Sequence, residues 1–304
     1  MRFVITGATG FIGTELSARL KAAGHDVIPI VRNRAQATGI AQSGSIVVAD
    51  IAQLDQLPPA DTVIHLAGLA HSRTAVESAY LRSNLNGTEA VVRAAKRANI
   101  RRIVFMSSIK AMGERSSAGF RPDDYPSPVD AYGRSKLAAE NIVRRFQGEW
   151  VIVRSPLIYG PGVKGNFHRL LQTVTARRPL PVGAIRNRRS MLYLGNCVHG
   201  LEHLATSDAA NRVALLSDGS PVSTPNLVRT IARNVGVNPR LIPVPVSLMY
   251  GAAWLVGRGA EVQKLAGDLF IDHEYSHASL GWKPPYTFEQ GIEQTVKSFL
   301  SVQS

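Results

Sequence analysis

Short apolar runs rich in Val and Ile recur along the first half of the chain, and helical patterns separate several of them. Strands that alternate with helices in this way predict a parallel sheet that carries helices on both faces. The runs are almost continuously apolar, which is typical of strands buried on both sides. The sequence therefore predicts an α/β protein with a doubly wound parallel sheet. The runs are residues 2–6, 25–31, 45–49, 62–67, 102–107 and 150–154.

The segment TGATGFIG (residues 6–13) follows the first run and opens a helical pattern, and it spaces three glycines as G-x-x-G-x-x-G. Gly7 permits a tight turn, Gly10 lets a pyrophosphate approach the backbone, and Gly13 allows the helix to pack closely on the strand. The helix N-terminus also offers unpaired N–H groups to phosphates. Strand, turn and helix together predict a Rossmann-type dinucleotide site. Its expected contacts are Gly7, Thr9, Gly10, Phe11, Ile12 and Gly13.

The end of the second run, IPIVRNR (residues 28–34), indicates which dinucleotide the site prefers. Proteins that bind NAD usually carry an acidic residue there, which binds the hydroxyls of the adenosine ribose. This chain has Val31 at that position, followed by Arg32 and Arg34. Guanidinium groups pair well with a 2′-phosphate. The sequence therefore favours NADP, with NAD as the alternative cofactor.

The rhythm of strands and helices loosens after about residue 158, where Pro and Gly clusters, a helical pattern near 166–177 and further scattered helices follow. We expect residues 1–158 to form the NAD(P)-binding domain. Residues 159–304 are expected to form a smaller α/β part that mainly binds substrate and is interleaved with the sheet, because ligands of such folds bind beyond the carboxyl ends of the strands.

The net charge of +13 suits an anionic partner, but the basic residues are spread along the whole chain. The sequence shows no basic motif studded with aromatic residues, so we do not expect a nucleic-acid partner. A single cysteine, Cys197, cannot form an internal disulfide, which favours a reducing compartment such as the cytoplasm. His199 and His203 have a metal-capable spacing but no third ligand nearby in sequence, so no metal is expected.

The segment LIPVPVSLMYGAAWLVG (residues 241–257) is the best candidate for contact with a membrane, because it carries no charge. It contains two prolines and falls short of the roughly 20 apolar residues that a transmembrane helix needs. No cleavable signal sequence is expected either, since RFVIT runs directly into the glycine turn. We therefore expect no integral membrane segment. We interpret residues 241–257 as a buried helix, with contact at a membrane surface as the alternative.

The segment AYGRSK (residues 131–136) places Tyr132 and Lys136 one helical turn apart. This spacing alone does not distinguish a solvated pair on a helix surface from an acid/base pair. A free tyrosine has a pKa of about 10 and is a poor base at neutral pH. A nearby ammonium group favours the phenolate, so Lys136 is expected to lower the pKa of Tyr132 towards neutrality.

Further segments follow the glycine turn: HLAGLA (65–70), SNLNGTEAVVRAA (83–95), FMSSIKAMGE (105–114), VRSPLIYGPG (153–162), GNF (165–167) and RNRRSMLYLGN (186–196). In their order and separation, they resemble the extended short-chain dehydrogenase/reductase family (the NAD-dependent epimerase/dehydratase family), in its nucleotide-sugar epimerase/reductase branch. The resemblance covers essentially the whole chain. It implies an enzyme that acts on a UDP-sugar.

The resemblance also implies roles for individual residues. Ser108 would orient the substrate oxygen, Tyr132 would transfer its proton, and Lys136 would hold the nicotinamide ribose. Met112 stands where the family has a tyrosine that flanks the substrate. Further implied cofactor contacts are Asp50, Ile51, Leu66, Ala67, Gly68, Asn84 and Pro156. The implied substrate contacts are His71, Ser108, Lys110, Asn166 and Arg189.

The reaction is expected to take place at C4 of the sugar. Dehydratases of the family carry Asp-Glu directly after the catalytic residue, whereas this chain has Ile109 and Lys110, which argues against 4,6-dehydration. Epimerases of the family return the hydride and retain NAD, while a 4-keto reductase consumes NADPH. Val31 and Arg32 favour the reductase. We therefore expect NADPH-dependent reduction of a UDP-4-keto-6-deoxy-(N-acetyl)hexose for bacterial surface polysaccharide synthesis.

Two alternatives stay open at this point. The first is a C4 epimerase of a UDP-(N-acetyl)hexosamine or UDP-glucose with bound NAD. The second is a catalytically silent NADP-binding regulatory protein, although such proteins typically lack the Tyr or Lys that this chain carries. The resemblance further suggests a homodimer formed through the helical segments 74–98 and 131–147, which the sequence alone does not decide.

Overall fold

A seven-stranded parallel sheet forms the centre of the computed structural model, which describes residues 1–33, 35, 44–69, 76–255 and 259–302. The strand order is β3-β2-β1-β4-β5-β6-β9, and every neighbouring pair is parallel. This arrangement confirms the doubly wound fold expected from the sequence. The strands are β1 (Arg2–Thr6), β2 (Asp26–Val31), β3 (Ile46–Val47), β4 (Thr62–His65), β5 (Arg102–Ser108), β6 (Glu149–Ser155) and β9 (Arg212–Leu215).

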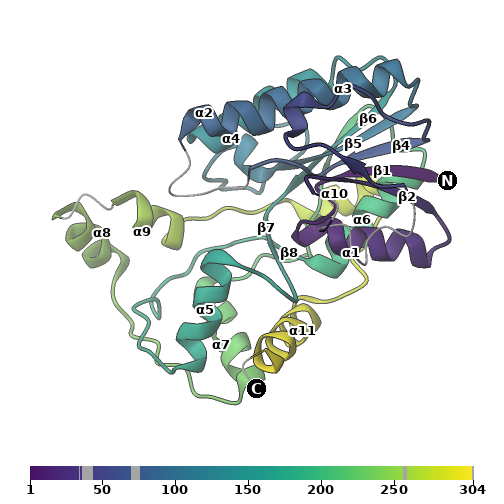
Figure 1. Cartoon of the computed structure of the whole chain (residues 1–304). Coiled ribbons are helices and arrows are strands. Elements are labelled where there is room, and N and C mark those ends of the chain that lie inside the picture. Colours follow the sequence, from purple (N-terminus) through teal and green to yellow (C-terminus); the bar gives the residue numbers. More distant parts are fainter. Residues whose placement is uncertain (34, 36–43, 70–75, 256–258, 303–304) are drawn as a thin grey trace.

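Helices cover both faces of the sheet (Figure 1). One face carries α1 (Phe11–Ala22) and α6 (Leu194–Thr206), and the other carries α3 (Gly87–Arg97) and α4 (Ala131–Val143). The short α2 (Glu77–Tyr80) and a π-helical turn (Leu81–Asn86) lead into α3. Helix α10 (His273–Leu280) packs beside β9.

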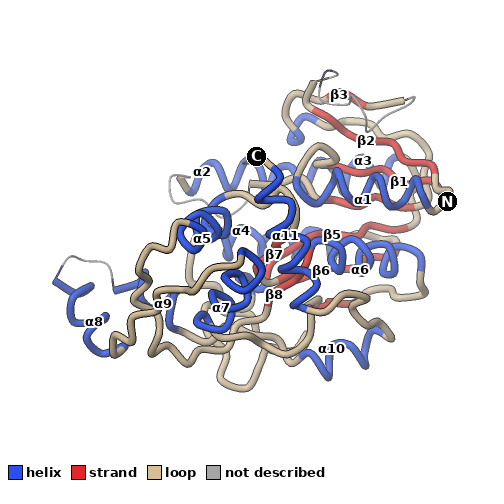
Figure 2. The backbone as a smooth tube through the Cα atoms, turned by 90° about the horizontal axis from the view of Figure 1, so that it is seen from below, coloured by secondary structure: helices blue, strands red, loops and turns tan. Residues whose placement is uncertain are grey.

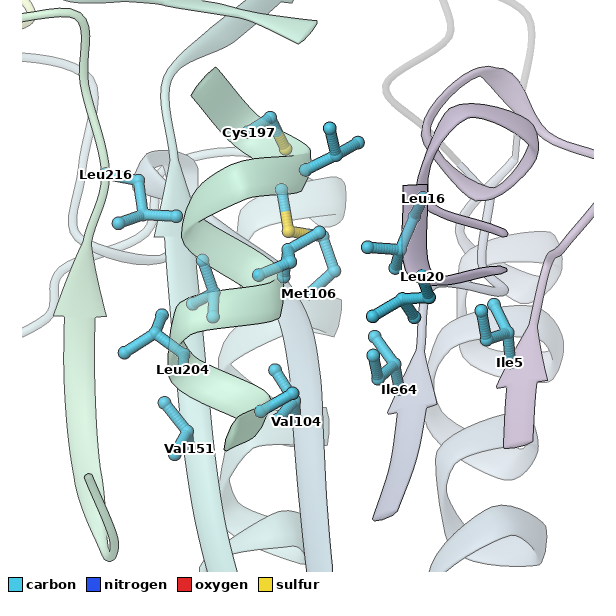
Figure 3. Packing of buried hydrophobic residues seen from close by; sticks show 14 of the residues in the cluster. Ile5, Leu16, Leu20, Ile64, Val104, Met106, Val151, Cys197, Leu204 and Leu216 are labelled. Carbon is cyan, nitrogen blue, oxygen red and sulfur yellow. The ribbon is translucent and has the colours of Figure 1, made fainter. Parts of the chain in front are cut away.

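Alternate residues of each strand enter the two cores, as the pleat of a strand dictates. Phe3 and Ile5 of β1 pack beneath α1 and α6, whereas Val4 packs beneath α3 and α4. Figure 3 shows the first of these cores, with Leu16 of α1 and Leu204 of α6 close to the strand residues. Both sides of the strands are therefore dry, which explains why their sequences are almost continuously apolar.

A smaller part lies below the sheet in Figure 1. Its two-stranded parallel sheet pairs β7 (Leu157–Tyr159) with β8 (Met191–Tyr193). Helices α5 (Gly165–Thr175), α7 (Thr224–Val235) and α11 (Phe288–Ser301) share one core with it. Since β9, α6 and α10 come from the same stretch of sequence, the chain beyond residue 158 also completes the large sheet.

Two short helices, α8 (Val246–Leu255) and α9 (Gly259–Ala266), project from the side of the molecule (Figures 1 and 2). The sequence predicted a buried helix here, and that prediction is wrong, because Leu248 is 64% and Trp254 80% exposed. Apolar composition alone does not say which faces of a helix find a partner in the fold. Among the described residues, no helix has the length and apolar character needed to cross a membrane.

Candidate active site

The turn between β1 and α1 is pressed against the chain that follows β4. Gly7 has φ +69°, and a Cβ added there would lie 2.8 Å from the backbone nitrogen of Ala67. A Cβ on Gly13 would lie 2.2 Å from the Gly7 carbonyl oxygen. Neither position tolerates a side chain, and Gly10 caps the N-terminus of α1 without any side-chain hydrogen bond. The N–H groups of the first turn of α1 therefore form a cradle that fits a pyrophosphate.

The end of β2 carries no carboxylate in its described part. Val31 is buried and its carbonyl oxygen accepts from the backbone nitrogen of Val48 at 2.9 Å, while Arg32 and Asn33 are exposed. Asp50, expected near adenine, accepts from the Ala52 backbone nitrogen at 3.0 Å and so caps the short helix Ile51–Gln53. Two residues named from the sequence, Arg34 and His71, lie outside the described part of the chain.

Asn84 joins the loop after β4 to the helix that carries Tyr132. Its Oδ1 accepts from the Leu69 backbone nitrogen at 2.7 Å, and its Nδ2 donates to Ser135 Oγ at 2.9 Å. Ser135 Oγ in turn donates to the Tyr132 carbonyl oxygen at 2.7 Å. The side chain of Asn84 is buried in a π-helical turn, a rare geometry that is frequent at functional sites. The structure thus gives Asn84 a positioning role, and its contact with a cofactor stays a prediction.

Ser108 and Tyr132 meet at the carboxyl end of β5. Helix α4 begins at Ala131 because Asp130 caps it, accepting from the Gly133 backbone nitrogen at 2.8 Å, and this places Tyr132 in the first turn. The hydroxyls of Tyr132 and Ser108 are hydrogen-bonded. Two hydroxyl groups side by side can both hydrogen-bond one substrate oxygen, which is the geometry that proton transfer to or from that oxygen requires.

Lys136 lies one turn further along α4 and is buried. Its ammonium group donates to the Met106 carbonyl oxygen at 2.9 Å and stands 5.0 Å from the centre of the Phe105 ring. A Cβ on Gly68 would lie 3.4 Å from Lys136 Nζ, so the loop after β4 approaches the ammonium group closely. Burial lowers the pKa of Lys136 to about 8, and the charge of Glu140 opposes this shift.

The expected effect of Lys136 on Tyr132 is not what this structure shows. The pKa of Tyr132 is raised to about 12, chiefly by burial, although the hydrogen bond from Ser108 opposes the shift. The charge of Asp130 raises it further. The ammonium group of Lys136 is directed at a backbone carbonyl instead. Tyr132 is therefore protonated at neutral pH, which suits a proton donor.

A buried ion pair lies behind the catalytic helix and was missed from the sequence. Glu140 of α4 receives two hydrogen bonds from Arg154 of β6, at 2.9 Å and 2.6 Å, and a third from Ser107 Oγ at 2.5 Å. Met112, expected beside the substrate, is 1% exposed and its sulfur contacts Arg154 instead, because its side chain turns into the core. Lys136 and Glu140 are one helical turn apart, so they lie on one face of the helix. That spacing could have indicated from the sequence that Glu140 lies near the catalytic lysine.

Lys110 and Arg189, both predicted to bind substrate, are linked through an acidic residue that sequence reasoning missed. The Lys110 ammonium group pairs with Glu114 and lies 3.4 Å from Asp130 Oδ2. Burial lowers the pKa of Arg189, and the charge of Glu114 counteracts this effect. Glu114 is therefore paired with Lys110 and acts on Arg189 through its charge, and Lys110 also lies near Asp130 at the first turn of the helix bearing Tyr132. Of the remaining predicted contacts, Asn166 is exposed at the start of α5 and Pro156 is buried between β6 and β7.

Comparison with known proteins identifies the family. The sequence profile of the NAD dependent epimerase/dehydratase family matches residues 3–214. The chain belongs to this family. Among its relatives, a UDP-glucose 4-epimerase of Vibrio cholerae is 35% identical, over 99% of this chain and 96% of the relative. An N-acetyl-α-D-glucosaminyl-diphospho-ditrans,octacis-undecaprenol 4-epimerase of Escherichia coli O157:H7 is 27% identical, over 97% and 94%. The resemblance drawn from the sequence motifs is thereby confirmed.

Solved structures support the same fold. The Bordetella bronchiseptica enzyme WbmG, in complex with NAD and UDP, superposes with a TM-score of 0.82 at 18% identity, over 99% of this chain and 96% of that one. MoeE5, in complex with UDP-glucose and NAD, superposes with a TM-score of 0.80 at 24% identity over the full length of both chains. As a member of the epimerase/dehydratase family, the chain is an enzyme of the nucleotide-sugar epimerase/reductase type.

The family's dinucleotide fits the residues that this family member presents. The turn before α1 is shaped by Gly7 and Gly13, because a Cβ at either position would clash with neighbouring backbone and displace the turn that presents the N-terminus of α1 to phosphates. Gly68 brings the loop after β4 close to Lys136, on the path from that cradle to Ser108 and Tyr132. The chain can therefore hold a dinucleotide along the carboxyl edge of its sheet, with the hydroxyl pair at one end.

Proposed function

We propose that the protein is an NADP-dependent oxidoreductase that reduces the C4 ketone of a UDP-4-keto-6-deoxy-(N-acetyl)hexose, a step in bacterial surface polysaccharide synthesis. The observation that carries this proposal is the end of β2. A carboxylate there would accept the ribose hydroxyls of NAD and repel a 2′-phosphate. This chain instead has the buried Val31 followed by the exposed Arg32, whose guanidinium suits a phosphate.

The hydroxyl pair can carry out this reduction. A ketone oxygen that lies against Ser108 and Tyr132 receives a hydrogen bond from each hydroxyl. As negative charge develops on that oxygen, Tyr132 donates its proton, and the raised pKa ensures that the proton is present at neutral pH. The bound nicotinamide supplies the hydride. Lys136 holds the ribose near Gly68, where its ammonium group already lies.

The residues after Ser108 support the exclusion of dehydration. Elimination across the sugar ring needs an acid and a base close to the reacting carbons. Ile109 is 2% exposed and has no proton to transfer. Lys110 is paired with Glu114 and directed towards Asp130. We assign Lys110, Asn166 and Arg189 to the nucleotide-sugar, since cations and amides are suitable partners for its diphosphate.

C4 epimerisation is the second candidate, and the 35% identical UDP-glucose 4-epimerase of Vibrio cholerae is the observation that favours it. An epimerase begins by removing a proton from the C4 hydroxyl, so its tyrosine must start as a phenolate. The same tyrosine returns that proton when the hydride comes back, so the hydroxyl pair serves either reaction. We place epimerisation second because epimerases of the family retain NAD, whereas Val31 and Arg32 at the end of β2 favour NADP.

The deciding experiment is to denature the purified protein, identify any nucleotide it releases, and then assay both reactions. We expect an empty protein that binds NADPH more tightly than NADH and oxidises NADPH with a UDP-4-keto-6-deoxy-N-acetylhexosamine. Tightly held NAD(H), with interconversion of UDP-glucose and UDP-galactose in the absence of added nucleotide, would establish the epimerase instead. NADPH binding without turnover of either substrate would instead favour a catalytically silent NADP-binding regulatory protein.

A matched pair of variants tests the argument about the cofactor. Removing the guanidinium in Arg32→Ala is expected to weaken NADPH binding about 10- to 150-fold and to leave NADH binding unchanged, because a charge-assisted hydrogen bond contributes about 1.5–3 kcal/mol. Arg93→Ala removes an exposed arginine on α3 and serves as the control. Equal NADPH affinity in the two variants would contradict the assignment of Arg32.

A further inference from the structure

Helix α8 is apolar on every side, and yet it is not enclosed by the protein. Its ten residues, VSLMYGAAWL, include no charged side chain. Leu248 is 64% and Trp254 80% exposed, and Ile242 in the segment before the helix is 46% exposed. A helix without a polar face is normally buried in a core or in a membrane. Apolar side chains gathered on one exposed element therefore indicate a surface that something else covers.

The way in which α8 is attached leaves these side chains on the outside. Val246 and Met249 pack against the core of the smaller part, together with Ala266 of α9. Leu248 and Trp254 are not part of that anchorage and are exposed. In Figures 1 and 2, α8 lies at the edge of the molecule, away from the sheet. A large flat surface can thus reach α8 without meeting the rest of the protein first.

Exposed arginines lie beside the start of the segment that leads into this helix. The Leu180 backbone nitrogen donates to the Arg240 carbonyl oxygen at 2.8 Å, and the Ile242 nitrogen donates to the Leu180 oxygen at 2.9 Å. These bonds hold Leu180 against residues 240–242, and Arg177 and Arg178 come just before Leu180 in the chain. Arg177, Arg178 and Arg240 are all exposed there. Positive charge therefore gathers where the chain leaves the smaller part towards α8.

We propose that α8 and these arginines, together called the α8 arm (Arg177, Arg178, Arg240, Ile242, Leu248 and Trp254), dock the protein on the surface of an anionic phospholipid bilayer. Tryptophan and leucine side chains enter the interface between head groups and acyl chains. Arginine side chains bind the lipid phosphates. Because α8 has only ten residues, the contact is peripheral.

Charge decides between a bilayer and a second copy of the chain. Each copy carries a net charge of +13, so two copies repel one another. A two-fold contact through α8 would also bring the same arginines of both copies together. An anionic bilayer satisfies the apolar and the basic residues at once. Docking of this kind would keep the enzyme at the surface where membrane-bound consumers of sugar nucleotides work.

Vesicle flotation with the full-length protein tests the proposal. We expect the protein to float with vesicles made of equal parts phosphatidylglycerol and phosphatidylcholine, to float much less with phosphatidylcholine alone, and to dissociate as salt rises. Leu248→Ser/Trp254→Ser should lose binding to both kinds of vesicle. Arg178→Ser/Arg240→Ser should weaken binding to the anionic vesicles roughly 25-fold, since each basic residue near such a surface contributes about fivefold.

The control is Tyr125→Ser, which removes an apolar side chain that is 91% exposed in the loop before α4. It should float as the unaltered protein does. All variants should unfold at the same midpoint temperature as the unaltered protein. Trp254 fluorescence should shift to shorter wavelength on anionic vesicles, and Trp254→Phe should abolish that shift, because Trp282 is buried and Trp150 packs against a core of the sheet. The proposal is wrong if the unaltered protein does not float with anionic vesicles, or if Leu248→Ser/Trp254→Ser still floats with them. A dimer in solution that Leu248→Ser/Trp254→Ser converts to monomer would overturn it in favour of a second copy.

Discussion

The substitution Glu140→Gln tests the buried ion pair behind the catalytic helix. Glu140 and Arg154 have side chains that are 0% and 1% exposed, and two hydrogen bonds join them. Glutamine keeps the size of the side chain but removes its charge, so the guanidinium of Arg154 is left buried without a counterion. Removing one partner of such a pair costs about 3–5 kcal/mol in the free energy of unfolding. That is a large share of the roughly 5–15 kcal/mol typical of a folded domain.

The same substitution should change catalysis through Lys136. Burial lowers the pKa of Lys136 to about 8, and Glu140 is the nearby charge that opposes this shift. Without that charge, the pKa of Lys136 falls further and the ammonium group loses its proton at lower pH. The proposed role of Lys136 needs the charged form. We therefore expect the alkaline limb of the rate profile to move to lower pH in Glu140→Gln.

The assay combines urea unfolding with rate profiles across pH. Glu140→Gln/Arg154→Met should recover most of the lost stability, because replacing both charges removes the unpaired guanidinium. Glu293→Gln breaks the exposed Lys297–Glu293 pair of α11 and should cost less than about 0.5 kcal/mol. If Glu140→Gln is no more harmful than Glu293→Gln, the energetic argument fails. A loss of stability with an unmoved alkaline limb would reduce Glu140 to a purely structural residue.

Three further predictions follow from the site and its support. Tyr132→Phe should lower turnover about 100- to 10,000-fold while leaving nucleotide affinity nearly unchanged, as measured by steady-state rates and nucleotide titration; undiminished turnover would contradict its role as proton donor. Gly7→Ala should weaken nucleotide binding at least tenfold in a titration, because its Cβ would lie 2.8 Å from the Ala67 backbone nitrogen. The control is Gly24→Ala, which has a similar φ of +79° but no atom within 4 Å of the added Cβ. It should strain the backbone and leave nucleotide affinity unchanged. Burial lowers the pKa of His65 to about 3 in the folded protein. Below pH about 6.5 the imidazole therefore takes up a proton in the unfolded chain but not in the folded one. The free energy of unfolding should fall as the pH drops from about 6.5. Urea unfolding of His65→Gln should show a shallower pH dependence, and an unchanged slope would mean that His65 does not cause it.

Local features were predictable because their meaning lies within a few residues. The glycine turn depends on spacing within residues 6–13, and the pair of Tyr132 and Lys136 depends on one helical turn. The glycine turn follows β1 in the sheet, and Tyr132 and Lys136 lie in α4, which begins at Ala131. Ser108 was identified from family resemblance, and the structure puts its hydroxyl against Tyr132. The sheet was predictable for a related reason, since strands buried on both faces have almost no polar residues.

Contacts between distant segments were not predictable in this way. Asn84 meets Ser135, 51 residues away, and Glu114 acts on Arg189 from the other part of the protein. Nothing in the sequence near Met112 indicates that its side chain turns into the core towards Arg154. Such meetings depend on how the loops at the carboxyl edge of the sheet close over one another, and a single sequence does not encode that in its local pattern.

The sequence by itself determined the kind of chemistry, and the tertiary structure decided its electrostatics. Residue types and spacing name a tyrosine, a lysine and a serine, but a pKa depends on how much water and charge surround a group. Burial raises the pKa of Tyr132, which the sequence predicted to be lowered. The charge of Glu140 opposes the lowering of the pKa of Lys136. Likewise, the composition of residues 241–257 shows an apolar helix, and only the fold leaves Trp254 outside. Burial is a property of the assembled chain, because it is set by segments that are far apart in sequence.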